Sequence, residues 1–71
     1  MTNDISRQAI KAVNEYAERA DGNWTEVSRL IEEDLETVRE WGTTGAKLYE
    51  STLRFAFNAM RPDGVPAISP P

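Results

Sequence analysis

One stretch decides the fold of this chain: residues 23–42 read NWTEVSRLIEEDLETVREWG. Its apolar residues recur every three or four positions, which is the spacing of one face of an α-helix. They are Trp24, Val27, Leu30, Ile31, Leu35, Val38 and Trp41. The side chain of Asn23 can accept the first free amide hydrogens, and the next glycine, Gly42, marks the end. The stretch therefore predicts an amphipathic helix over residues 24–41.

The segment before this helix has the same apolar spacing, from Ile5 to Ala20. Arg7, Lys11 and Glu15 stand between the apolar positions, as on the solvent side of a helix. The glycine that follows, Gly22, commonly accepts the left-handed conformation past a helix end. A helix is predicted over residues 4–20.

A third helix is predicted over residues 46–60, after the short loop formed by residues 42–45. One face of it carries Leu48, Tyr49, Thr52, Leu53, Ala56, Ala59 and Met60. Phe55 and Phe57 lie to either side of that face, which makes the apolar arc too wide for one partner helix. The extra width predicts a contact with a second subunit or another target.

The end of the chain is predicted to leave the helical domain, which covers residues 1–61. Pro62 sets its own φ and Gly64 accepts a positive φ, so a turn is expected there. Three further prolines follow among residues 65–71, and each lacks an amide hydrogen. We expect residues 62–71 to be an extended or disordered tail that becomes ordered on binding.

Together these segments predict an all-α fold, either an antiparallel helical hairpin or a three-helix bundle. The expected inner core consists of Ile31, Leu35, Val38, Leu48, Leu53 and Ala56. A chain of 71 residues buries only roughly 60% of the surface that its unfolded form exposes. We therefore expect self-association or a partner to complete the fold.

The composition argues against catalysis. The sequence has no cysteine and no histidine, so thiol nucleophiles, disulfides and the usual acid-base group at neutral pH are missing. Glu32, Glu36 and Glu40 are four apart and could pair around a cation, but a solvated acidic face is the favoured interpretation. No catalytic, cofactor or metal site is predicted. The polar start and the lack of a long apolar run predict a cytoplasmic protein.

Part of the middle helix resembles a helix-turn-helix motif. Residues 24–31 followed by residues 35–41 have its spacing, with Ser28 as the small residue and Val38 and Trp41 as core residues. The resemblance covers about 18 of the 71 residues and implies a DNA-binding regulator.

The resemblance fails at two features. Glu32 stands where the motif usually has its turn glycine, and the second helix would carry mostly acidic residues, which repel phosphate. One continuous helix is therefore favoured. An acidic inhibitor that imitates nucleic acid is a further alternative, because the formal net charge is −4 and arises in the middle segment.

The predicted function is protein binding, by a self-associating helical module or by a small accessory subunit held on a larger protein. Nucleic acid and membranes are not expected partners. The residues predicted to bind the partner are Phe55, Phe57, Met60, Trp41, Trp24, Tyr49, Val65 and Ile68.

Overall fold

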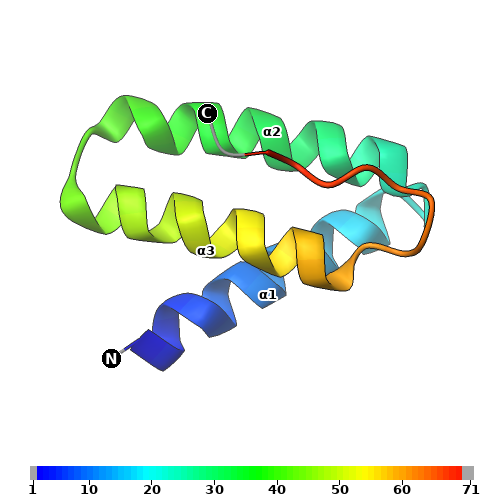
Figure 1. Ribbon diagram of the computed structural model, residues 1–71, viewed down its shortest axis with the longest axis horizontal. Coiled ribbons are helices and arrows are strands. Elements are labelled where there is room, and N and C mark those ends of the chain that lie inside the picture. The colour runs from blue at the N-terminus through cyan, green and yellow to red at the C-terminus, as the bar shows by residue number, and fades with distance from the viewer. Residues whose placement is uncertain (1, 70–71) are drawn as a thin grey trace.

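The computed structural model describes the backbone of residues 2–69 and the side chains from Asp4 onward, and its regular structure is helical. The helices are α1 (Thr2–Arg19), α2 (Trp24–Trp41) and α3 (Thr44–Met60). In Figure 1, α2 and α3 run antiparallel and α1 crosses them at an angle. Each helix contacts the other two, so the packing is that of a three-helix bundle. The prediction of an all-α chain is confirmed.

The caps of α2 and α3 explain where these helices begin and end. The Asn23 side chain accepts a hydrogen bond from the Glu26 amide at 3.3 Å, and Gly42 adopts the left-handed conformation with φ 66°. Thr43 accepts a hydrogen bond from the Ala46 amide at 3.1 Å. Because Thr43 is the capping residue, α3 begins at Thr44, two residues before the predicted start.

A reverse turn with two residues at positive φ joins α1 to α2. The Gly22 amide donates to the Ala17 carbonyl at 3.2 Å, and the Asp21 amide donates to the Glu18 carbonyl at 3.1 Å. This pair of bonds is the Schellman arrangement, in which the first residue past the helix is left-handed. That residue is Asp21, with φ 52°, and Gly22 follows with φ 82°. The left-handed position thus falls one residue before the expected glycine.

Replacing Asp21 by Gly should therefore stabilise the fold by about 0.5–1 kcal/mol. Glycine avoids the steric penalty of the left-handed conformation, and the change removes a carboxylate from the negative end of α1. The midpoint of urea unfolding should rise without a change in slope. Gly22→Ala, which adds a side chain at φ 82°, is the opposite control and should lower the midpoint. A midpoint that falls in Asp21→Gly would contradict the assignment.

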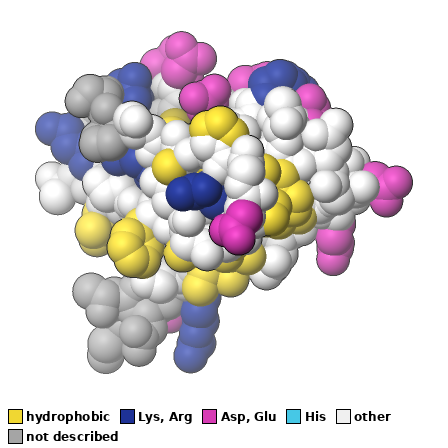
Figure 2. Space-filling model, turned by 45° about the vertical axis from the view of Figure 1, so that its right-hand side comes forward, with side chains coloured by type: hydrophobic (Ala, Val, Ile, Leu, Met, Phe, Trp, Pro, Cys, Tyr) yellow, Lys and Arg dark blue, Asp and Glu magenta, His cyan; other side chains and the backbone are white. Residues whose placement is uncertain are grey.

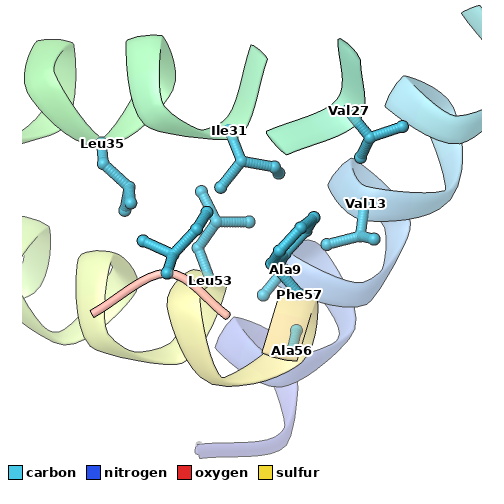
Figure 3. Close-up of a cluster of buried hydrophobic side chains, with 9 residues drawn as sticks. Ala9, Val13, Val27, Ile31, Leu35, Leu53, Ala56 and Phe57 are labelled. Carbon is cyan, nitrogen blue, oxygen red and sulfur yellow. The ribbon is translucent and has the colours of Figure 1, made fainter. Parts of the chain in front are cut away.

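The core lies where the three helices meet. Ala9 and Val13 from α1, a line of residues from α2, and three residues from α3 point into one cluster (Figure 3). The cluster consists of Ala9, Val13, Val27, Ile31, Leu35, Leu53, Ala56, Phe57 and Ile68. Four of its members were predicted as inner-core residues, namely Ile31, Leu35, Leu53 and Ala56. Val38 is buried too, as predicted.

Leu48 is the exception among the predicted core residues, because 48% of its surface is exposed. The inner face of α3 is centred on Leu53, with Ala46 and Phe57 on the same side. At 100° per residue, Leu48 lies about 140° from Leu53 and therefore faces outward. The prediction for Leu48 was wrong because two neighbouring stripes on α3 are both apolar.

The segment after α3 folds back onto the bundle of its own chain, although it was expected to become ordered only on binding a partner. Val65 donates its amide to the Pro62 carbonyl at 3.3 Å, and Gly64 has φ 93°, so the predicted turn is present. Beyond it, Ile68 is buried in the core cluster. The side chain of Asn58 holds the Ile68 backbone by two hydrogen bonds, at 2.9 and 3.0 Å. Residues 62–69 are thus packed on their own chain; Pro70 and Pro71 lie outside the described residues.

Residues 24–41 do not form the helix-turn-helix motif that the resemblance implied, and DNA binding itself stays untested. Residues 24–41 form one uninterrupted helix, and Glu32 and its neighbours are helical. Without a turn in this segment there is no second helix to lay in a groove of DNA. The favoured interpretation, one continuous amphipathic helix, is confirmed.

Candidate functional site

The residues predicted to bind a partner fall into three groups. Phe55 and Trp41 are largely exposed, at 75% and 63% of their surface. Phe57 and Ile68 are buried in the core. The remaining four are half-buried, and these are Trp24, Tyr49, Met60 and Val65.

The buried group cannot offer its side chains to a partner in this folded state. Phe57 is fully buried, and its ring centroid lies 6.1 Å from that of Trp24. Trp24, Tyr49, Met60 and Val65 pack against the core cluster that contains Phe57 and Ile68. Six of the eight candidate residues therefore stabilise the bundle itself. Tyr49 and Met60 also line open grooves, whereas the other four fill the space between the helices and the tail. We omit these four from the contact surface.

Phe55 and Met60 line an open groove between α1 and α3, which we call the Phe55 groove. Its volume is about 320 Å³, and its walls are Ser6, Ile10, Thr52, Phe55, Ala56, Ala59 and Met60. None of these side chains is charged, and the polar groups among them are two hydroxyls. Ile10, one of the apolar residues between Ile5 and Ala20 that mark the first helix, is 45% exposed at the edge of this groove.

Trp41 and Tyr49 line a different groove, at the end of the bundle where α2 joins α3. Its volume is about 470 Å³, and its walls are Ile5, Gln8, Asp34, Val38, Trp41, Thr43, Gly45, Ala46 and Tyr49. It differs from the Phe55 groove in containing a carboxylate, Asp34, and two loop or first-turn residues, Thr43 and Gly45. The predicted contact residues thus do not form one surface.

The outer face of α3 differs in charge from those of the other helices. Among the exposed positions of α3, all of which the structure describes, Lys47 alone is charged; the others are Thr44, Gly45, Leu48, Ser51, Phe55 and Ala59. The exposed face of α2, in contrast, includes Glu32, Glu33, Glu36 and Glu40. In the space-filling view, hydrophobic side chains reach the surface in the middle and lower parts, whereas acidic side chains project mainly from the upper and right-hand edges (Figure 2).

An ion-pair cluster around the buried Glu50, between α2 and α3, was not foreseen from the sequence. Glu50 is buried, and its Oε1 accepts hydrogen bonds from Arg39 Nη2 at 3.1 Å and Arg54 Nη2 at 3.2 Å. This cluster removes the acidic side chain of α3 from the exposed surface. The one available signal was the spacing of Glu50 and Arg54, four apart on a helix.

The acidic face of α2 is partly neutralised by its own arginine. Arg29 forms ion pairs with Glu26 and Glu33, and the hydrogen bond from Arg29 holds the pKa of Glu26 below its usual value. Within residues 2–69, no group of three or more acidic side chains is placed to hold a metal ion. The exposed acidic residues of α2 therefore have the geometry of an ordinary solvated helix face. The nucleic-acid-mimic hypothesis stays an untested alternative.

One tyrosine contact links α1 to α2 on the inner side of the bundle. The Tyr16 hydroxyl donates a hydrogen bond to Asp34 Oδ2 at 3.1 Å, and the Arg19 guanidinium lies 5.8 Å from the ring centre. Burial first, and then the charge of Asp34, raise the pKa of Tyr16 to about 12. Burial and the same carboxylate also raise the pKa of Tyr49.

These pKa values predict a loss of stability at high pH. The Tyr16 pKa is about 12 in the folded chain and about 10 in the unfolded chain, so the folded state keeps the phenolic proton longer. The protonated Tyr16 hydroxyl therefore contributes its full stabilisation below pH 10, and this contribution is lost as the pH rises toward 12. Tyr16→Phe should cost about 1 kcal/mol at pH 7 through the lost hydrogen bond. Unfolding by urea at pH 8, 10 and 11 should show a shallower decline in Tyr16→Phe; parallel declines would refute this assignment.

No helix among the described residues combines the length and the apolar character needed to cross a bilayer.

Comparison with known proteins adds no family assignment, because no family model, no curated protein and no solved structure matches the chain. Any function must therefore be inferred from the geometry of this molecule, and the uncharged outer face of α3 with the Phe55 groove is its most distinctive surface.

Proposed function

We propose that this chain is a non-catalytic protein-interaction module, which acts either by self-association or as a small subunit bound to a larger protein. The observation that carries the proposal is Phe55, whose aromatic side chain is 75% exposed beside an uncharged groove. Large exposed apolar patches on small soluble domains commonly mark contact sites. Aromatic residues are also enriched among the residues that dominate binding energy.

The proposed contact surface consists of Leu48, Phe55, Ala59 and Met60 from α3 and Ile10 from α1. Leu48 and Phe55 are seven residues apart, so they lie on one line along the helix. Of the residues predicted from the sequence, Phe55 and Met60 belong to this surface, and Trp41 and Tyr49 lie on the other groove. We favour the Phe55 groove because it has no charge that binding would leave desolvated.

A photo-crosslinking amino acid at position 55, expressed in the source cells, tests this proposal. The side chain at position 55 points outward, so the substitution should leave the fold intact. The expected result is a covalent adduct of defined mass after illumination. The matched control carries the same group at Glu33, on the exposed face of α2, and should give no such adduct. Equal labelling from both positions, or none from position 55, would refute the proposed surface.

A further inference from the structure

The shape of the Phe55 groove indicates which partner it fits. Five of its walls come from α3, and four of these are Thr52, Phe55, Ala56 and Ala59. These positions are i, i+3, i+4 and i+7, which is the set of four residues that forms the hole for one knob of a facing helix. Three of the four are small, so the hole is open, and its edge is completed by Ile10 from α1.

We propose that the occupant of this groove is Phe55 of a second copy, so that the chain forms a two-fold dimer in which the α3 helices pack antiparallel. This inference rests on the proposed function, since it names the partner of the same surface. A two-fold contact requires a self-complementary patch, on which the same residues supply both the knob and the hole. Phe55 meets that condition because it projects from the groove that it helps to form.

The arrangement of charges supports a second copy rather than a strongly charged partner. The whole chain carries a net charge of −4, so two copies repel each other wherever their acidic faces meet. Contact through α3 avoids this repulsion because the exposed acids of α2 lie on another face, and Glu50 is neutralised by Arg39 and Arg54. Lys47 is the one charged residue among the exposed positions of α3, a helix that the structure describes in full, so the α3 faces of two copies carry no acidic side chains that would repel each other.

The available area places the proposed dimer among small interfaces. A standard interface buries about 800 Å² per partner, which would be about a sixth of the 4894 Å² surface of this chain. α3 is about 25 Å long at 1.5 Å per residue, so one face of it falls below that area unless α1 contributes. The dimer therefore belongs at the weak end of interface sizes. We expect a dissociation constant of tens of micromolar.

The knob position also fixes the register between the two helices. If Phe55 fills the hole centred between residues 55 and 56, Thr52 lies opposite Ala59 of the other copy. If the two helix axes are about 8–10 Å apart, the Cα atoms of Thr52 and the opposite Ala59 would be about 4–6 Å apart, which is within the range of a disulfide. Two copies of Thr52, or two copies of Ala59, would be offset by about 10 Å along the axis. They would be too far apart for a disulfide.

Sedimentation equilibrium from 10 µM to 1 mM tests whether the dimer exists. The wild-type chain should dimerise, and Phe55→Ser should raise the dissociation constant at least about 30-fold. Trp41→Ser removes a comparably exposed aromatic residue from the other groove and should leave the constant unchanged. A wild-type chain that is monomeric at 1 mM, or equal weakening by both substitutions, would overturn the inference. Circular dichroism of each variant verifies that it is folded.

Disulfide formation tests the arrangement, because the natural chain has no cysteine. A mixture of Thr52→Cys and Ala59→Cys chains should form a mixed disulfide, while each variant alone should not. Self-linked Thr52→Cys chains would indicate parallel helices and overturn the proposed geometry. The proposed function is tested separately by the adduct at position 55. A monomeric chain whose position 55 crosslinks to a different protein would refute the second copy and support the interaction module.

Discussion

Phe57→Ala should remove a large part of the stability of this protein, and this is the largest effect expected of any single substitution. Phe57 is fully buried at the centre of the core, where it contacts the Trp24 ring. Truncating a buried phenylalanine costs about 3–5 kcal/mol through lost burial and the cavity that remains. A chain of this size has a total stability of about 4–10 kcal/mol, so the loss consumes a large part of it. Thermal unfolding followed by circular dichroism should show a midpoint far below that of the wild type.

Phe55→Ala provides the matched control for this prediction, two residues away on the same helix. Phe55 is 75% exposed, so its truncation should change the stability of the monomer by less than about 0.5 kcal/mol. Both variants should be measured at low micromolar concentration, where the proposed dimer is dissociated. Comparable destabilisation by the two substitutions would contradict the assignment of Phe57 to the core and Phe55 to the surface.

The contrast between Phe55 and Phe57 shows how far sequence reasoning reaches. Apolar spacing and capping residues predicted the helices, because periodicity and caps act locally along the chain. The same spacing could not decide which of two apolar stripes on α3 faces inward. That choice depends on α1, which crosses α3 and covers the side that carries Phe57. For this reason Phe57 was expected at the contact surface and Leu48 in the core, and their positions are reversed.

The tail was harder to predict for a different physical reason. Its prolines correctly excluded a helix, but they carry no information about where an extended segment docks. The docking depends on Asn58, whose amide offers a donor and an acceptor that match one residue of extended backbone. An asparagine on a helix has no special spacing in the sequence. The buried Glu50 was missed similarly, because its arginine partner Arg39 comes from α2.

Ile68→Ala should destabilise the folded chain by about 3 kcal/mol, the second largest expected effect. The Ile68 side chain is buried in the core cluster that includes Leu35 and Leu53. Its truncation removes apolar contacts and leaves a cavity under the tail. Ala67→Ser, at the exposed neighbouring position, should have little effect. Urea unfolding of both variants measures the difference, and an Ile68→Ala midpoint equal to that of the wild type would show that the tail is not part of the core.

Asn58→Ala separates the hydrogen bonds of the tail from its hydrophobic contact. The Ile68 amide donates to Asn58 Oδ1 at 2.9 Å, so it should exchange slowly with deuterium in the wild type. Asn58→Ala removes this acceptor without touching Ile68, and exchange at that amide should become fast. Exchange in the core of α2 should change much less, since α2 keeps its helical hydrogen bonds. If Ile68 stayed protected in Asn58→Ala, burial alone would hold the tail, and the asparagine would be dispensable for its docking.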